Sequence, residues 1–235
     1  MKLKIQRYIK EKEFNTLIEY DVEKKVTTLL EALEYIKQTK DSSLAFESGC
    51  RSGVCGSCSV QVDGKATLAC SHKLQEDAVV VEPLKNMPLI RDLVVDMTQA
   101  YQTTKKAQAW LHLLDKETKI TDEDEHINRV QSDCILCGSC YSACPVFAVN
   151  KNFLGPFALT RSWKYVADKR EAQPAVDVLQ TDGIWDCTLC NECTMVCPQE
   201  ISSKADIEKL RSKSAMMGYS DPNFAANFGG FELSF

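Results

Sequence analysis

The amino-acid sequence predicts an α+β protein in which a mixed α/β region precedes an all-helical one. Three observations predict this class: strand-like alternation in the first 95 or so residues, helical stretches from about residue 98, and a cysteine motif that occurs twice in the helical part. A chain of 235 residues has room for one or two domains at about 100–200 residues each. We therefore expect domains at 1–97 and 98–213, followed by a tail at 214–235.

The first region has the pattern of a hairpin followed by an amphipathic helix. Lys2–Ile9 and Leu17–Val22 alternate as paired strands do. Leucine and isoleucine recur at helical spacing within Val26–Ile36, and Thr27 or Thr28 can cap that helix.

A second hairpin is indicated by the dipeptide Asp63-Gly64 between Val60–Val62 and Ala66–Ala69. Asp-Gly suits a two-residue turn because both positions must adopt positive φ angles. Val79–Val81, just before Pro83, predicts a closing strand.

The second region predicts helices at Ala107–Leu114 and Phe157–Ala167, with an acidic linker or loop at Asp115–Glu125. The tail carries four phenylalanines at helical spacing, but Gly229-Gly230 disfavours a stable helix there. Exposed phenylalanines favour docking of the tail onto a partner over a loose terminus. These phenylalanines are at positions 224, 228, 231 and 235.

Charge and hydropathy exclude several classes of function. The net charge is −5 and neither half of the chain has a basic surplus, so we expect no nucleic-acid partner. No apolar run approaches the roughly 18–20 residues of a membrane span. The first residues lack the apolar stretch of a signal peptide. We expect a cytoplasmic protein, or one exposed to the cytoplasm on a membrane complex.

Twelve cysteines fall into three groups of four with none left over. Because disulfides are disfavoured in a reducing cytosol, so many thiols indicate metal binding. The groups are Cys50, Cys55, Cys58 and Cys70; Cys134, Cys137, Cys140 and Cys144; and Cys187, Cys190, Cys193 and Cys197.

The first group has the spacing C-x4-C-x2-C-x11-C, typical of plant-type ferredoxins that hold a [2Fe–2S] cluster. Gly49, Gly53 and Gly56 allow the loop to wrap closely around a compact anion and point N–H groups at its sulfurs. A structural zinc site is the alternative, but zinc loops usually pair two C-x2-C knuckles. We call Cys50, Cys55, Cys58 and Cys70 the first site.

The other two groups are a repeat of C-x2-C-x2-C-x3-C-P, 53 residues apart, the run of bacterial two-cluster ferredoxins. In such runs the fourth cysteine ligates the other cluster, so each predicted ligand set takes one cysteine from the opposite run. The second site is then Cys134, Cys137, Cys140 and Cys197, and the third site is Cys144, Cys187, Cys190 and Cys193. Both sites are expected to hold [4Fe–4S] clusters.

No other motif supplies substrate chemistry. His72, His112 and His126 are scattered and fit surface or capping roles, and the chain has neither a Gly-x-Gly-x-x-Gly motif nor a phosphate loop. Four cations near the C-terminus predict a solvated helix face, with a partner or membrane surface as the alternative: Lys204, Lys209, Arg211 and Lys213. The catalytic chemistry is therefore expected to belong to partner proteins, and the chain to carry electrons between them.

The chain resembles the iron–sulfur subunit of the succinate dehydrogenase/fumarate reductase family over roughly residues 1–213. Several segments carry this resemblance in order. They are SGCRSGVCGSC at 48–58, TLAC at 67–70, Pro83-Leu84, IRDLVVDM at 90–97, and FLGP at 153–156.

The resemblance implies an N-terminal β-grasp [2Fe–2S] ferredoxin domain followed by a helical ferredoxin domain. It also implies a partner subunit with covalent FAD that interconverts succinate and fumarate, and a membrane-associated, quinone-reactive anchor subunit. The chain would then lie peripherally on the cytoplasmic side of the cell membrane. A thiol- or disulfide-linked fumarate reductase, another flavin dehydrogenase, and a zinc-stabilised scaffold are the alternatives.

Two departures from the family pattern concern the third site. Most family members lack its second cysteine and hold [3Fe–4S], whereas Cys190 is present here, so [4Fe–4S] is expected over [3Fe–4S]. Ala148, Val149 and Thr188 stand where quinone-binding members have a tryptophan and a histidine. Both departures resemble the variant group whose anchor carries cysteine-rich repeats.

Overall fold

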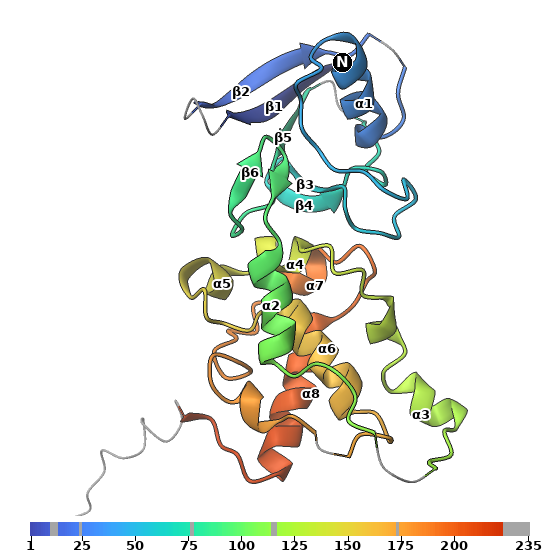
Figure 1. Ribbon diagram of the computed structural model, residues 1–235, viewed down its shortest axis with the longest axis vertical. Helices are drawn as coiled ribbons and strands as arrows, with labels where there is room; N and C mark the ends of the chain where they lie inside the picture. The colour runs from blue at the N-terminus through green and yellow to red at the C-terminus, as the bar shows by residue number, and fades with distance from the viewer. Residues whose placement is uncertain (10–13, 24, 76–77, 114–116, 173, 223–235) are drawn as a thin grey trace, which may run out of the picture. The chain divides into compact units, whose positions relative to one another are not determined.

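A computed structural model describes residues 1–9, 14–23, 25–75, 78–113, 117–172 and 174–222 (Figure 1). The chain forms two compact units. Among the described residues, the first unit comprises those within 1–100, 134–144 and 192–201, and the second comprises those within 101–133, 145–191 and 202–222. Two cysteine-rich segments thus belong to the same unit as the N-terminal region. The tail phenylalanines expected to dock onto a partner lie outside the described residues.

A five-stranded sheet of order β2-β1-β5-β3-β4 lies in the first unit (Figure 1). β1 pairs antiparallel with β2 and parallel with β5, while β3 pairs antiparallel with both β4 and β5. The strands are β1 (Lys2–Ile9), β2 (Phe14–Asp21), β3 (Ser59–Val62), β4 (Lys65–Leu68) and β5 (Ala78–Glu82). The predicted strands of the mixed α/β region are confirmed, with ends shifted by up to three residues.

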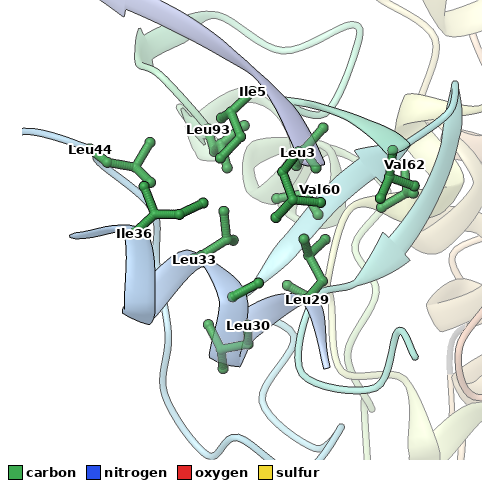
Figure 2. Close-up of a cluster of buried hydrophobic side chains, with 14 of the residues drawn as sticks. Leu3, Ile5, Leu29, Leu30, Leu33, Ile36, Leu44, Val60, Val62 and Leu93 are labelled. Atoms are coloured by element: carbon green, nitrogen blue, oxygen red, sulfur yellow. The ribbon is translucent and has the colours of Figure 1, made fainter. Parts of the chain in front are cut away.

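Helix α1 (Leu29–Thr39) packs its apolar face against this sheet. Thr28 caps the helix in a capping box with Glu31, which confirms one of the two predicted caps. In Figure 2, Leu29 and Leu33 of α1 lie beside Leu3 and Val60 of the strands, and all four side chains are buried. Each buried leucine contributes about 1.5–3 kcal/mol relative to an exposed one.

The alternation of β1 places a charged side chain, Arg7, on the face that also buries Leu3 and Ile5. The Arg7 guanidinium is 3% exposed, and its Nε lies 3.0 Å from a carboxylate oxygen of Asp92, which is fully buried. It also donates to Tyr20, Ser43 and Asp41. Burial raises the pKa of Asp41, but hydrogen bonds from Ser43, Tyr20 and Arg7 outweigh this and lower it. Two carboxylates, a phenol and a hydroxyl thus surround the Arg7 guanidinium, in keeping with the pairing that a buried charge requires.

Two hairpin turns of this unit include a non-glycine residue with a positive φ angle. Asp63 (φ 49°) and Gly64 (φ 80°) form the predicted two-residue turn. Asp92 (φ 47°) lies between β6 (Leu89–Arg91) and β7 (Val94–Val95), a small hairpin that the sequence did not predict. Its carboxylate accepts hydrogen bonds from the amides of Tyr8 and Ala45, so it joins three segments of the unit.

Helices make up most of the regular structure after residue 97. The α-helices are α2 (Thr98–Lys106), α3 (Asp122–His126), α4 (Ser139–Ser142), α5 (Pro145–Val149), α6 (Pro156–Val166), α7 (Glu192–Met195) and α8 (Ser203–Met216). Two 3-10 turns, η2 (Val130–Asp133) and η3 (Asp177–Leu179), connect them. In the second unit α6 packs against α8, burying Phe157, Leu159, Ile207 and Leu210. None of the described helices is long and apolar enough to cross a lipid bilayer.

The prediction of a helix at Ala107–Leu114 is wrong for the described residues 107–113. The helix of this region is α2, which ends at Lys106, and Gln108 then adopts a φ of 46° that an α-helix cannot contain. Four residues later, the His112 amide donates to the Glu171 carboxylate and the His112 carbonyl accepts a hydrogen bond from the Ala172 amide, so neither group forms a helical hydrogen bond. Tertiary hydrogen bonds therefore replace the helix that the local composition favours.

The acidic run Asp115–Glu125 is not wholly a loop, because its end belongs to α3. Thr121 caps this short helix and forms a capping box with Asp124. Acidic side chains in a first helical turn are stabilised by the partial positive charge of the helix N-terminus. The prediction of a loop overlooked this cap, which is visible in the sequence T-D-E-D.

A buried carboxyl group links α8 to the turn η2 in the second unit. Asp206 is 1% exposed, accepts a 2.8 Å hydrogen bond from Gln131 Nε2, and lies 3.7 Å from Lys209 Nζ. Burial raises the pKa of Asp206 to about 6, and the Gln131 and Lys209 contacts offset only part of this rise. Compared with the unfolded chain, the fold therefore favours the protonated acid.

Because the folded protein holds this proton more tightly than the unfolded chain does, the contribution of Asp206 to stability is present below pH 4 and is lost as the pH rises through about 6. The full loss corresponds to about 3 kcal/mol, at about 1.4 kcal/mol per pKa unit. Asp206→Asn should flatten the dependence of the melting temperature on pH between about 4 and 7, where the unfolded chain has lost this proton and the folded protein still holds it. The matched control is Glu208→Gln on the exposed face of α8, which should keep the wild-type slope. An unchanged slope in Asp206→Asn would refute this assignment.

Candidate iron–sulfur cluster sites

All twelve cysteines are free thiols, distributed over both units. The first site and the second site lie entirely within the first unit. The ligands predicted for the third site are divided in the chain: Cys144 and Cys193 belong to the first unit, and Cys187 and Cys190 to the second. Among the described residues, no three or more His, Cys, Asp or Glu side chains lie close enough together to hold a single metal ion.

Backbone amides surround the sulfur atoms of the first site. Cys50 Sγ accepts hydrogen bonds from the amides of Ser52 (3.4 Å), Val54 (3.3 Å) and Cys55 (3.2 Å). Cys70 Sγ accepts one from Gly53 (3.2 Å), whose φ of 77° turns its amide toward that sulfur. Converging N–H groups are a binding arrangement for anionic sulfur.

Hydrogen bonds from these amides lower the pKa of a thiol, as a site that binds thiolates requires. The Ser52, Val54 and Cys55 amides lower the pKa of Cys50 to about 6, so this thiol ionises near neutral pH. Burial raises the pKa of Cys58 to about 12. A thiolate at Cys58 therefore needs a bound cation to offset its burial, and the iron of a cluster would supply that charge.

The loop of the first site also has no room for larger side chains. A Cβ atom at Gly49 would lie 2.9 Å from Cys55 Sγ and 3.1 Å from Ser57 Oγ. The donor set, the inward amides and this close approach of the backbone all fit a compact sulfide cluster.

In the second site, the structure brings cysteines from two distant segments together. Burial raises the pKa of Cys140 well above its usual value, and the neighbouring thiols Cys137, Cys134, Cys193 and Cys197 raise it further. Thiols that disfavour one another's ionisation must lie close together, so Cys197 approaches the Cys134–Cys140 loop. Cys197 Sγ also accepts a 3.4 Å hydrogen bond from the amide of Ile201. Five thiols, the four predicted ligands and Cys193, therefore act on one another here, and the four predicted ligands are all partly buried. Thiols gathered in this way fit an iron–sulfur cluster.

The two repeated motifs share their backbone conformation. Leu136 (φ 53°) and Leu189 (φ 55°) occupy the third position of each run, and both are left-handed. Gly138 (φ 81°) and Asn191 (φ 72°) occupy the fifth position, and both are left-handed as well. Leucine rarely adopts positive φ, and such strain is found where a site requires it. Cys137 and Cys190 thus have the same local backbone setting.

In the second unit, Cys187 Sγ accepts a 3.4 Å hydrogen bond from the amide of Leu189. Burial raises the pKa of Cys187, while the Leu189 amide and the charge of Arg211 lower it in part. Cys190 is exposed, whereas Cys144 and Cys193 are buried in the first unit. The third site as a set of four ligands remains a prediction.

A close contact joins the loops of the first and second sites. A Cβ atom at Gly56 would lie 2.8 Å from Cys137 Cβ and 3.1 Å from the carbonyl oxygen of Ile135. Gln199, two residues after Cys197, donates a 3.1 Å hydrogen bond to the carbonyl of Gly53. Two separate contacts therefore hold the loop of the first site against the segments of the second.

Sequence reasoning missed two residues that hold the cluster segments. Asn86 Nδ2 lies 3.0–3.3 Å from the carbonyl oxygens of Tyr141, Ser142 and Cys144, at the end of α4. Gln61 on β3, 2% exposed, donates a 2.8 Å hydrogen bond to Ser142 Oγ. A polar residue at an inward strand position was the available signal for Gln61.

The histidines have the structural roles that the sequence favours. His112 Nδ1 lies 3.3 Å from a carboxylate oxygen of Glu171, and its Nε2 accepts a 2.9 Å hydrogen bond from Trp110. The carbonyl of His72 accepts a hydrogen bond from the amide of Leu29 at the start of α1. His126 is the exposed last residue of α3.

Comparison with known proteins identifies both parts of this arrangement. Residues 2–102 match the family described as a 2Fe-2S iron-sulfur cluster binding domain, and residues 130–201 match the 4Fe-4S dicluster domain. The β-grasp and helical ferredoxin expectations are thereby confirmed.

Relatives with named functions align with four fifths or more of the chain. The 8-methylmenaquinol:fumarate reductase iron-sulfur subunit of Wolinella succinogenes is 36% identical, over 93% of this chain and 74% of its own length. The fumarate reductase iron-sulfur subunit of Mycobacterium tuberculosis is 37% identical, over 80% of this chain and 81% of its own. A chain of the Mycobacterium smegmatis Sdh1 complex superposes with a TM-score of 0.84 at 26% identity, covering 94% of this chain and 98% of that one. The chain is an iron–sulfur electron-transfer subunit of the succinate dehydrogenase/fumarate reductase family.

Proposed function

We propose that the chain relays single electrons between a FAD-containing subunit, which interconverts succinate and fumarate, and a quinone-reactive anchor subunit. The observation that carries this proposal is the contact of Gly56 with Cys137. It fixes the loop of the first site against a predicted ligand of the second, as a carrier of electrons between the two requires. In this arrangement the chain is a peripheral subunit on the cytoplasmic side of the membrane that holds the anchor.

Three clusters are held by the twelve thiolates in this proposal. A [2Fe–2S] cluster binds at the first site, and [4Fe–4S] clusters bind at the second site and the third site. When bound, such clusters accept and release one electron at a time. The residues of the chain hold the sulfurs in place and direct N–H groups at them, which stabilises the added negative charge of reduction.

The identity of the third cluster rests on Cys190. Its neighbours Leu189 and Asn191 repeat the left-handed conformations of Leu136 and Gly138, which flank Cys137. Since Cys137 stands at the same position of a run expected to hold four irons, the same backbone presents Cys190 as a fourth ligand. This supports a complete [4Fe–4S] cluster rather than [3Fe–4S].

The residues near the third site also favour a particular kind of anchor. Val149, at the end of α5, is 87% exposed, and Thr188 is exposed in the loop between Cys187 and Leu189. Neither provides the aromatic or imidazole group that quinone-binding members of the family place there. We therefore favour an anchor with cysteine-rich repeats as the acceptor beyond the third site.

Electron paramagnetic resonance of the purified complex tests the cluster assignment. We expect no sharp [3Fe–4S] signal in the oxidised complex, and one [2Fe–2S] signal with two interacting [4Fe–4S] signals after full reduction. Cys190→Ala should lower the iron content by one atom per chain and produce the [3Fe–4S] signal. A [3Fe–4S] signal in the wild type, equal in amount to the [2Fe–2S] signal, would contradict the role of Cys190.

Succinate-dependent dye reduction by the same preparation tests the wider function. We expect succinate to reduce the dye only when the FAD-containing subunit is present. Complexes in which another flavoprotein co-purifies, or in which succinate fails to reduce any cluster, would contradict the proposal and favour a different flavin dehydrogenase.

A further inference from the structure

The sequence predicted that Arg211 lies on a solvated helix face. In the structure its side chain instead contacts the backbone of another segment. From α8, its Nε donates a 2.8 Å hydrogen bond to the carbonyl of Ile184, and its Nη2 reaches the carbonyls of Cys187 (2.6 Å) and Trp185 (3.2 Å). The guanidinium carbon also lies 5.4 Å from the centre of the Trp185 ring. One side chain thus contacts three residues of the segment that enters the third site.

This segment is fixed at its start and strained at its end. A Cβ at Gly183 would lie 2.1 Å from the carbonyl oxygen of Leu179, which also accepts the amide of Ile184 at 2.9 Å. After Cys187 the chain turns through two left-handed residues, Leu189 and Asn191. Strained loops persist only where their surroundings hold them, and the planar fork of arginine holds several acceptors at once.

Arg211 also places a permanent positive charge beside Cys187. Its contact with the Cys187 carbonyl places the guanidinium on the residue that carries the predicted ligand sulfur. A fixed cation favours whichever redox state of a nearby group is more negative, which is the reduced state. A half-buried position limits the screening of this effect by salt.

We propose that Arg211 is a positioning residue of the third site: it clamps the Ile184–Cys187 segment, so that the Cys187 thiolate is held in place, and its charge raises the reduction potential of the cluster bound there. The inference rests on the proposed function, since it assigns a redox group to Cys187. The clamping of the segment follows from the hydrogen bonds of Arg211 alone, whereas the effect on the reduction potential requires a bound cluster.

The test uses the intact complex with three variants. Arg211→Gln removes both the charge and the planar set of guanidinium donors. Arg211→Lys keeps the charge but lacks the planar donors. Lys213→Gln is the control and removes a charge two residues further along the same helix. Redox titration of the third-cluster signal reports the potential. Hydrogen exchange at the amides of Ile184 and Asp186 reports the clamp without depending on any cluster.

In Arg211→Gln we expect the ratio of reduced to oxidised third cluster at a fixed potential to fall about tenfold, equivalent to about 59 mV for one electron. The two amides should exchange at least about tenfold faster. Arg211→Lys should exchange faster but keep a potential close to that of the wild type, and Lys213→Gln should change neither. If Arg211→Lys is the only Arg211 variant that yields folded complex, hydrogen exchange at the two amides of this variant tests the clamp. Exchange at the wild-type rate would then overturn it.

Wild-type potential and exchange in Arg211→Gln would overturn the inference entirely. A wild-type complex with no third-cluster signal would instead refute the proposed function, while the exchange rates would still decide the clamp. The two failures are thus distinguishable in one set of samples.

Discussion

Replacing Arg7 with leucine is expected to destabilise the first unit by about 3–5 kcal/mol, because it removes one partner of a buried ion pair. Asp92 is fully buried, and its carboxylate would lose the guanidinium 3.0 Å away. Asp41 and Tyr20 would lose the same donor. The lowest-temperature melting transition should fall by at least about 6 °C, since 1 kcal/mol shifts the melting temperature by about 2–8 °C for small to medium-sized domains.

Lys4→Leu is the matched control, because it removes the same charge from an exposed position of the same strand. It should alter stability by less than about 0.5 kcal/mol. The double variant Arg7→Leu with Asp92→Asn should recover part of the loss, since the unpaired charge is then gone. An Arg7→Leu protein that melts at the wild-type temperature would show that the pair contributes nothing.

Gly56→Ala is expected to disturb two cluster sites at once. Its φ of 75° costs an alanine about 1–2 kcal/mol. The new Cβ would also lie 2.8 Å from Cys137 Cβ and 3.0 Å from Cys137 Cα, and overpacking of this kind adds about 1–3 kcal/mol. Because Cys137 is a predicted ligand, we expect fewer irons per chain and a weaker magnetic interaction between the first two clusters.

Gly64→Ala separates the cost of the backbone from the cost of the contact. Gly64 has a similar φ of 80°, but a Cβ there would meet no atom within 4 Å. This variant should lose only the backbone component and keep its full iron content. Equal losses of stability and of iron in the two variants would show that the contact with Cys137 is unimportant.

The sequence predicted the elements whose signals are local. Asp63-Gly64 predicted a turn, and the alternation of Lys2–Ile9 predicted a strand, because both depend on residues adjacent in the chain. It failed at Ala107–Leu114, where Gln108 leaves the helical region and His112 bonds to Glu171 instead. Helical composition cannot show that distant partners will compete for the same backbone groups.

The candidate sites divide in the same way. Cysteine spacing by itself determined the kind of cofactor, because the ligands of one cluster come mostly from a single short loop. The tertiary structure alone decided what surrounds those loops. It gave the inward-facing Arg7 its carboxylate partner Asp92, set Gly56 against Cys137, and turned Arg211 from a solvated helix face to the carbonyls before Cys187. Each of these pairs joins residues far apart in the chain, and such pairings follow from packing, which no local pattern of residues contains.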